Sequence, residues 1–230
     1  DFGTITFTGN DIGKTYKYTI VEQERVDYAK TNGINLVSEP IDGITFDTAE
    51  KTVTIEVTEA IESGAPVVKA TVTADGSHEQ GDYGYFTVTN KYNTSGTIGD
   101  GDGSGAIKVK KVIEGRDWQS GDSFEFTLEA EDGTPMPTSD KVTITNATAD
   151  HTASFGEITF TKAGTYTYKI TEAPGSIGGM TYAKDPVTVT VVVEDDGKGK
   201  LTAKSITYDG TVADAATFTN SYKATGTLVG

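Results

Sequence analysis

The sequence predicts an all-β protein built from tandem immunoglobulin-like antiparallel β-sandwiches. Thr and Val are abundant in the 230 residues and Leu is rare, a composition that favours strands over helical bundles. Apolar and polar residues alternate in short segments separated by turn residues, as they do in half-buried strands. No window of helical length shows a 3.6-residue apolar period. Short strands at this spacing are typical of an antiparallel sandwich.

An internal repeat organises the chain. Residues 1–23 match residues 154–175, and "VTNKYNTSGTIG" at 88–99 matches "FTNSYKATGTLVG" at 218–230. The repeat predicts a partial first module at 1–93, a linker at 94–104, a complete second module at 105–223 and the start of a further linker at 224–230. The first module lacks the region equivalent to 105–153. We therefore expect the chain to be a fragment of a longer protein.

The segment 94–104 is small, polar and rich in Gly, which predicts a linker. Its residues Asp100 and Asp102 suggest calcium. However, the Glu expected at the twelfth position of an EF-hand loop is absent, because that position is Lys111. The sequence therefore favours a linker with no specific ion, and it indicates no metal and no cofactor.

The second module contains the clearest predicted strands. Each is rich in β-branched or aromatic residues and alternates in polarity. The turn "DGKGK" between two of them predicts a hairpin. The predicted strands are 106–113, 123–130, 141–147, 154–160, 165–172, 187–195, 201–210 and 217–222.

Three of these strands carry a polar residue in their apolar phase. Side chains alternate along a strand with period two, so Lys111 shares the face of Val109, and Glu172 shares that of Ile170. Asn220 lies in the same way between Phe218 and Tyr222. Each would be costly to bury alone, whereas together they could satisfy one another. Lys108 and Lys110 compete with Lys111 by proximity, but they fall in the solvent-facing phase.

The triad suggests covalent chemistry. A buried Lys has a lowered pKa, so its neutral amine can act as a nucleophile on the Asn220 carboxamide and displace ammonia. Glu172 would polarise the carbonyl and relay protons. The product would be an amide between Lys111 and Asn220 that joins the first and last strands. The residues alone also allow a simple hydrogen-bonded triad, or polar tips that reach water at strand ends.

Several stretches in order carry a family resemblance: "KKVIEGRDWQSGDSFEFTLEAEDGTPMP", "FGEITFTKAGTYTYKITEAPG", "TVTVVVEDDGKGKLTA" and "ATFTNSYK". The chain resembles the pilin isopeptide-linkage domain of Gram-positive surface proteins, over nearly all of 105–223 and much of 1–93. The resemblance implies a self-catalysed Lys–Asn isopeptide bond, with the amine at Lys111, the assisting acid at Glu172 and the acceptor at Asn220.

The first module departs from this pattern. Glu22 and Asn90 match the catalytic acid and the acceptor, but the strand that would carry the Lys is missing. We expect Asn90 to be an acceptor whose donor lies outside this chain. The donor could lie upstream in a longer protein, or a neighbouring chain could donate the strand. A third explanation is a Lys from a different strand of the same module.

Composition excludes several function classes. The net charge of −15 argues against nucleic-acid binding and against docking on an anionic membrane. The chain has no Cys, and no apolar run is long enough for a membrane helix. We expect an extracellular, cell-wall-attached stalk module whose partners are neighbouring repeats or subunits of a fibre, and not a turnover enzyme. The alternative is an adhesin module that binds a host glycan or protein, with residues 24–45 as its candidate loop.

Overall fold

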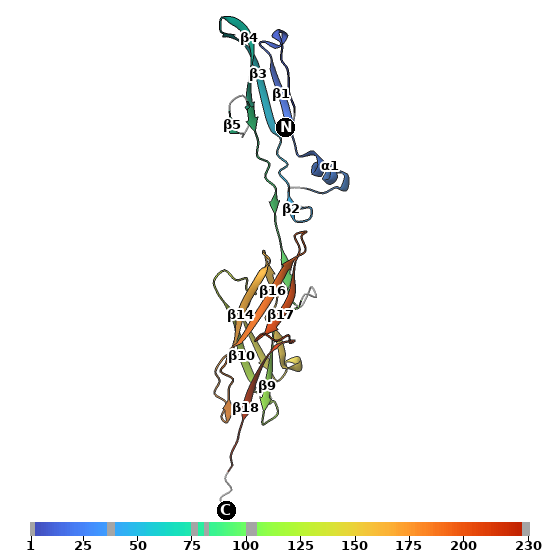
Figure 1. Ribbon diagram of the computed structural model, residues 1–230. Helices are drawn as coiled ribbons and strands as arrows, with labels where there is room; N and C mark the ends of the chain where they lie inside the picture. Colours follow the sequence, from blue (N-terminus) through green and yellow to red (C-terminus); the bar gives the residue numbers. More distant parts are fainter. Residues whose placement is uncertain (1–2, 36–39, 75–77, 81–82, 100–104, 227–230) are drawn as a thin grey trace, which may run out of the picture. The chain divides into compact units, whose positions relative to one another are not determined.

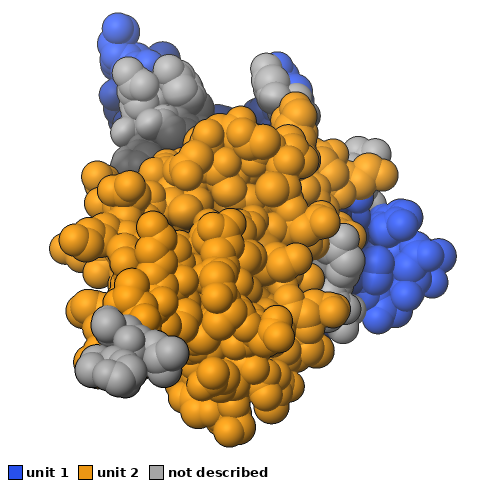
Figure 2. All heavy atoms as spheres, turned by 90° about the horizontal axis from the view of Figure 1, so that it is seen from below, with its two compact units in different colours: residues 1–92 blue, residues 93–230 orange. Residues whose placement is uncertain are grey.

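The computed structural model divides into two compact units, residues 1–92 and residues 93–230, which are coloured separately in Figure 2. Each unit is considered by itself. The structure describes residues 3–35, 40–74, 78–80, 83–99 and 105–226. Phe2, the calcium candidates Asp100 and Asp102, and most of the tail at 224–230 therefore lie outside the described residues.

The second unit is a β-sandwich (Figure 1). One sheet has the strand order β11-β10-β14-β16-β17, the other has the order β12-β9-β18-β15, and β13 pairs with β8. The elements are β8 (Gly96–Ile98), β9 (Lys108–Glu114), β10 (Ser123–Ala130), β11 (Lys141–Thr145), the 3-10 turn η2 (Ala149–His151), β12 (Thr152–Ser154), β13 (Ile158–Phe160), β14 (Gly164–Glu172), β15 (Met180–Thr181), β16 (Val187–Asp195), β17 (Leu201–Tyr208) and β18 (Ala216–Tyr222). The all-β prediction is confirmed.

The core of this unit lies between its two sheets. Alternate side chains of each strand point inward, and the rings of Phe126 and Phe218 meet across the sandwich with centroids 5.2 Å apart. Ile107, Val109, Tyr168 and other members of the same cluster are buried. Aromatic and β-branched residues fill this interior well, which is why so lean an apolar composition still forms a core.

One strand pair departs from the antiparallel prediction. The first long strand, β9, lies parallel to the last, β18, with Lys111 beside Phe218 and Ile113 beside Asn220. Parallel neighbours need a crossover, and here the whole module between them supplies it. Strand periodicity gives no information on direction, so the alternation in the sequence could not reveal this pair.

Part of the expected linker belongs to the second unit. Residues Gly96–Ile98 form β8, which pairs with β13, and Ile98 is buried. A Cβ on Gly96 would lie 2.0 Å from the Leu201 carbonyl oxygen, so only Gly fits at this contact. Close packing therefore accounts for the glycine at position 96.

The first unit contains one sheet of three strands, in the order β1-β3-β4 (Figure 1), and two short pairs, β2-β7 and β5-β6. Its elements are the 3-10 turn η1 (Gly9–Asp11), β1 (Thr15–Ile20), α1 (Gln23–Asn32), β2 (Ile44–Thr45), β3 (Lys51–Glu62), β4 (Ala65–Ala74), β5 (His78–Gln80), β6 (Tyr83–Tyr85) and β7 (Lys91–Tyr92). A small cluster around Ala29 and Phe46 is buried.

Helix α1 corrects the expectation that the chain has no helical window. Its apolar period is weak, because its sequence QERVDYAKTN contains few apolar residues: Val26, Tyr28 and Ala29. The helix ends at Gly33, which adopts the left-handed conformation and donates its N–H to the last carbonyls. The "NG" pair at Asn32–Gly33 is a C-terminal helix signal that the sequence does contain.

The two units share local topology. In the second unit, β15 pairs with β18 through Met180 and Tyr222. In the first unit, β2 pairs with β7 in the same way, through Ile44 and Tyr92. The residues that directly follow the Asn, 91–92 in the first unit and 221–222 in the second, therefore pair with an equivalent short strand in both units.

Candidate functional site

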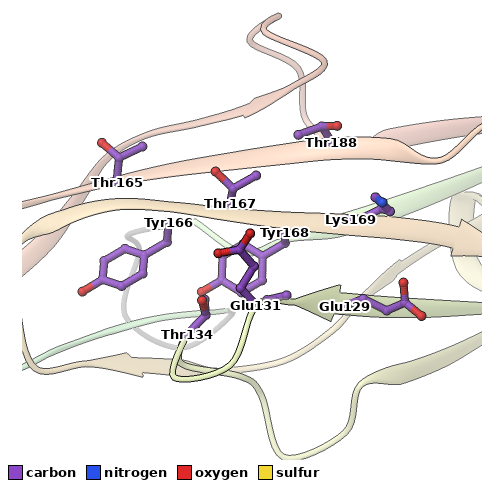
Figure 3. A pocket seen from close by; sticks show the side chains of 10 residues that line it. Glu129, Glu131, Thr134, Thr165, Tyr166, Thr167, Tyr168, Lys169 and Thr188 are labelled. Atoms are coloured by element: carbon purple, nitrogen blue, oxygen red, sulfur yellow. The ribbon is translucent and has the colours of Figure 1, made fainter.

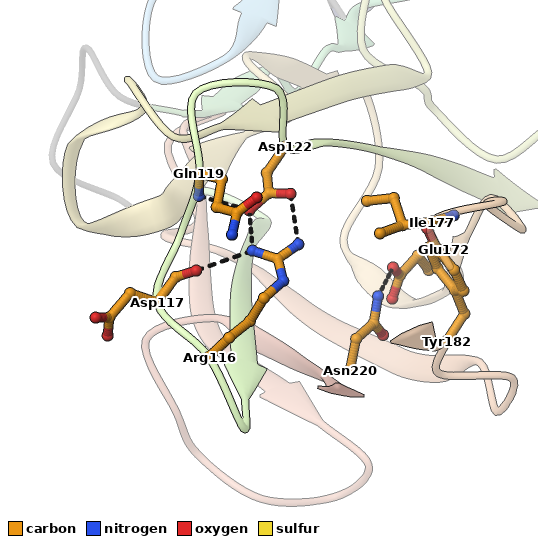
Figure 4. Close-up of polar contacts among 8 residues, drawn as sticks. All are labelled: Arg116, Asp117, Gln119, Asp122, Glu172, Ile177, Tyr182 and Asn220. Atoms are coloured by element: carbon orange, nitrogen blue, oxygen red, sulfur yellow. Dashed lines mark hydrogen bonds and ion pairs between the residues drawn. The ribbon is translucent and has the colours of Figure 1, made fainter. Parts of the chain in front are cut away.

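The three polar residues predicted to share a face of the second module do meet. Lys111 projects from β9, Glu172 from the end of β14 and Asn220 from β18, so two sheets contribute to the cluster. Lys110, one residue before Lys111, is exposed, which agrees with the predicted strand phase. Figure 4 shows Glu172 and Asn220 side by side within the sandwich.

One carboxylate binds both the Lys111 amine and the Asn220 carboxamide. The Lys111 amine donates to Glu172 Oε2 over 2.7 Å, and the Asn220 carboxamide nitrogen donates to Glu172 Oε1 over 2.6 Å. Lys111 is 1% exposed and Asn220 is 0% exposed. The amine and the carboxamide are therefore adjacent to the same acid in a site closed to water.

A backbone group completes the site. The Ala183 N–H donates to Asn220 Oδ1 over 2.8 Å, so the carboxamide oxygen already accepts a fixed hydrogen bond. A donor in this position stabilises negative charge that develops on the oxygen during nucleophilic attack. The sequence could not indicate this group, because every residue except Pro carries a backbone N–H.

Burial controls the electrostatics of the amine. Desolvation lowers the pKa of Lys111 below its usual value, and this outweighs the opposing effects of the hydrogen bond and the charge of Glu172. The amine also lies 5.0 Å from the centre of the Phe124 ring. A lowered pKa increases the fraction of neutral amine, which is the nucleophilic form.

The first unit contains the acceptor half of the same site. Asn90 donates its carboxamide nitrogen to Glu22 Oε1 over 3.2 Å, and its oxygen accepts from the Asp47 N–H over 2.9 Å. These contacts match those of Asn220 with Glu172 and Ala183. Asn90 is exposed, whereas Asn220 is buried. The structure places the predicted pair Glu22 and Asn90 together, without an amine on the second carboxylate oxygen.

Sequence reasoning missed the ion pair between Arg116 and Asp122. Arg116 donates from both terminal nitrogens to the Asp122 carboxylate, each over 2.7 Å, and Asp122 also accepts the Gln119 N–H (Figure 4). The Arg116 hydrogen bonds hold the pKa of Asp122 below its usual value. The Arg116 guanidinium lies 5.1 Å from the centre of the Tyr222 ring, two residues beyond Asn220. This pair fixes the loop after β9 against the end of β18.

The second unit also has a surface groove away from the predicted site residues. A groove of 620 Å³ is lined mainly by polar residues of β10, β14 and β16, including Glu129, Thr167 and Lys169 (Figure 3). None of the predicted site residues lines it.

Within the described ranges, no cluster of His, Cys, Asp and Glu could hold a metal ion, and no helix is long and apolar enough to cross a membrane. The candidate ligand loop at 24–45 contains α1 and β2, and its residues 36–39 lie outside the described residues.

Comparison with known proteins gives a family match over both units. Residues 1–93 and 107–223 match the FctA family model, described as a Spy0128-like isopeptide-containing domain. Among solved structures, the chain is similar to the major pilin of Streptococcus pyogenes, with 22% identity and a TM-score of 0.36 over 51% of this chain and 50% of that one. A second major pilin of this species gives 20% identity and a TM-score of 0.36 over 57% and 56%. The chain spans about half the length of these pilins. A comparison with curated proteins found no match.

Proposed function

The chain belongs to the family of Spy0128-like isopeptide-containing domains, and on this basis we propose that its second unit is a load-bearing module tied by a Lys111–Asn220 isopeptide bond. The observation that carries the proposal is the shared carboxylate. Glu172 binds the amine with one oxygen and the carboxamide with the other, and all three side chains are buried.

The reaction needs only groups that are present in the site. Glu172 accepts a proton from the Lys111 amine, and the neutral Nζ attacks Cγ of Asn220. The Ala183 N–H stabilises the charge that develops on Oδ1. The Nζ–Cγ bond forms, and the Cγ–Nδ2 bond breaks as Glu172 passes the first proton to Nδ2, which leaves as ammonia. Nζ then gives its second proton to the Glu172 carboxylate, which leaves a neutral amide. The packed strands supply the proximity that makes this slow aminolysis feasible, and it occurs once in each molecule.

The position of the bond suggests mechanical work. It joins β9 and β18, the first long strand and the last strand of the module, which are direct neighbours. Tension applied at the two ends of the module therefore passes through the bond, and the sheets between Lys111 and Asn220 carry no load. The bond also closes a loop of about 100 residues, which restricts the unfolded state.

This role fits a stalk on a bacterial surface. We assign the units as successive modules of a pilus shaft or a wall-attached adhesin, with neighbouring modules or subunits as partners. The family match in both units supports a tandem arrangement. A covalent tie needs no Cys, and the chain has none, so the cross-link survives reducing conditions.

Intact-mass measurement tests the proposal. We expect the protein to be lighter than its sequence by the mass of one ammonia, with a cross-linked peptide that joins Lys111 to Asn220. Lys111→Ala, Asn220→Ala and Glu172→Gln each abolish this loss. The matched control is Lys110→Ala, which removes the exposed neighbouring amine and leaves the loss intact. An unmodified mass for the folded wild-type protein would refute the proposal.

A further inference from the structure

The second unit receives a short strand from the segment that joins the two modules. This strand, β8, pairs antiparallel with β13 and places Ile98 opposite Ile158. The Ser95 carbonyl, just before β8, accepts the Leu201 N–H of β17 over 2.9 Å. Ile98, Ile158 and Leu201 are each no more than 2% exposed. The joining segment therefore contacts both β13 and β17 and helps to bury one core residue of each.

The first unit contains an equivalent of β13. Residues 5–7, "ITF", have the same sequence as β13. Phe7 packs on Tyr16 with ring centroids 5.5 Å apart. Phe160 packs on Tyr166 in the same way, with centroids 4.6 Å apart. The local packing of this segment is therefore repeated in the first unit.

The first unit also contains an equivalent of Leu201. Val68 lies opposite Glu59 in the β3–β4 pair. Leu201 lies opposite Asp195 in the β16–β17 pair. The two hairpins occupy the same position, one beside β1 and the other beside β14. Both partners of β8 in the second unit therefore have counterparts in the first.

These counterparts are uncovered. Ile5 is 49% exposed, whereas its equivalent Ile158 is 0% exposed. Val68 is 37% exposed, whereas its equivalent Leu201 is 2% exposed. Within the described residues of the first unit, no strand pairs with residues 5–7. The exposed apolar positions are thus those that β8 covers in the second unit.

The tail of the chain has the sequence of the missing strand. "TGTLVG" at 225–230 repeats "SGTIG" at 95–99, with Leu228 at the position of Ile98. It keeps the glycine that β8 needs for its close approach to β17, since Gly226 is equivalent to Gly96. The strands β7 and β18 both end four residues before this glycine. The tail can therefore follow the second unit as β8 follows the first.

We propose that residues 5–7 and Val68 form a docking site for the tail, residues 225–229, of a second copy of this chain. The tail adds to residues 5–7 as an antiparallel strand, in the manner of β-augmentation. Leu228 covers Ile5 and Val68, as Ile98 lies among their equivalents. The junction between two copies then repeats the junction between the two units of one copy.

The β8 contacts fix the register of this pairing. Ile158 lies opposite Ile98 and Thr159 opposite Thr97, and the hydroxyl oxygens of these two threonines are 3.0 Å apart. The same register places Leu228 opposite Ile5 and Thr227 opposite Thr6. Both hydroxyls of the threonine pair are therefore kept in the contact between copies.

A contact of this kind is heterologous, because the tail of one copy meets a different surface of the next. Each added copy leaves a tail at one end of the assembly and a docking site at the other. Association therefore continues into longer head-to-tail species rather than stopping at a dimer. Its strength does not depend on the Lys111–Asn220 bond, since none of the docking residues belongs to that site.

Sedimentation velocity on two full-length variants tests the proposal. We expect the wild-type chain to form longer species as its concentration rises. Ile5→Glu removes the docking site and Leu228→Glu removes the tail, so each variant alone should stay monomeric. An equimolar mixture should give a dimer and nothing longer, because one intact tail meets one intact docking site. The matched control is Val212→Glu, which changes an 80% exposed valine outside the contact and leaves wild-type association intact.

Disulfide trapping tests the register, because the chain has no Cys of its own. Directly opposite residues of neighbouring strands are close enough for a disulfide. A Thr6→Cys chain mixed with a Thr227→Cys chain should form an interchain disulfide on oxidation. A Thr19→Cys chain, which changes an exposed threonine of the same unit, should not react with the Thr227→Cys chain.

Several results would overturn the inference. They are a wild-type chain that stays monomeric at every concentration, association that survives in either Glu variant alone, and a mixture of the two that forms no dimer. The intact mass is measured separately, so the proposed function has its own outcome. A wild-type chain that associates but loses no ammonia would refute the bond alone, and one that loses ammonia but stays monomeric would refute the docking site alone.

Discussion

The two units hold the same Glu–Asn pair in two different environments. Asn220 is buried and shares Glu172 with Lys111, whereas Asn90 is exposed and shares Glu22 with no amine among the described residues. In both units, a backbone N–H donates to the carboxamide oxygen of the Asn: that of Asp47 in the first unit and that of Ala183 in the second. Each of these residues lies four positions before the next long strand, β3 or β16. The acceptor geometry therefore forms from local strands alone. The amine comes from β9, and the described part of the first unit has no equivalent strand.

Loss of the cross-link should produce the largest difference between the units. We expect Glu172→Gln to leave the second unit folded, because the amide keeps the shape of the acid, but unbonded. Its free energy of unfolding should fall by about 5 kcal/mol, the loop-closure value for a loop of about 100 residues. Calorimetry on the wild type and the variant measures this change.

The matched variant for this comparison is Glu22→Gln in the first unit. It should shift neither transition by a comparable amount, because no bond depends on Glu22 in the chain alone. A similar loss from both variants would mean that the cross-link does not distinguish the units.

The Arg116–Asp122 pair is the next largest test. Both side chains are nearly buried, and the first unit lacks the segment that carries them. Asp122→Ala leaves the Arg116 guanidinium without its partner, so we expect a loss of about 3–5 kcal/mol in the second unit only. Urea unfolding followed by Trp118 fluorescence monitors that unit specifically, because it holds the single Trp.

An exposed ion pair provides the control. Glu125 pairs with Lys141 over 2.9 Å with both side chains largely in solvent. Glu125→Ala should therefore cost no more than about 1 kcal/mol. An equal cost for Asp122→Ala and Glu125→Ala would show that Arg116 does not fix the end of β18.

Strand phase explains why much of the site could be predicted from the sequence. Lys111, Glu172 and Asn220 each follow apolar residues at period two, and that pattern is local to each strand. The structure brings the three together because each strand buries the face that its own sequence specifies. Their role in bond formation stays a prediction until the cross-link is measured.

The features that were missed are those without a local signature. The Ala183 N–H depends on how the chain before β16 crosses β18, and the β9–β18 direction depends on the whole topology. Strand β8 has too few residues to show an alternating pattern. Helix α1 has a weak apolar period and was visible only through Gly33 at its end. Residue types and spacing carry none of the long-range information in the first two cases.

A smaller effect tests whether β8 belongs to the second unit. Gly96→Ala would place a Cβ 2.0 Å from the Leu201 carbonyl oxygen, so β8 must move away from β17. We expect a loss of about 1–3 kcal/mol in the second unit, the usual range for overpacking. The matched control is Gly226→Ala, in the repeated "GT" motif of the tail, where a Cβ would meet no atom within 4 Å. Thermal unfolding of both variants compares the two positions, and an unchanged transition for Gly96→Ala would contradict the packing.

The smallest expected difference concerns the equivalent tyrosines of the two units. Tyr16 donates its hydroxyl to the Asp11 carboxylate over 2.6 Å, whereas Tyr166 donates to the Lys162 carbonyl over 2.8 Å. The Tyr16 hydrogen bond, followed by those of Thr8, lowers the pKa of Asp11 to about 2. Because the folded pKa lies below the ordinary value of about 3.9, this contact stabilises the first unit fully above that value and is lost as pH falls through about 2.

The tyrosine contact of the second unit involves a carbonyl, which does not titrate, so acid should weaken only the first. An NMR titration of the Asp11 carboxyl should give a midpoint near 2, and Tyr16→Phe should move it upward towards 3.9. Tyr166→Phe should leave it unchanged. If the Asp11 midpoint did not respond to Tyr16→Phe, the hydroxyl could not be the cause of the lowered pKa, and acid would no longer distinguish the two tyrosine contacts.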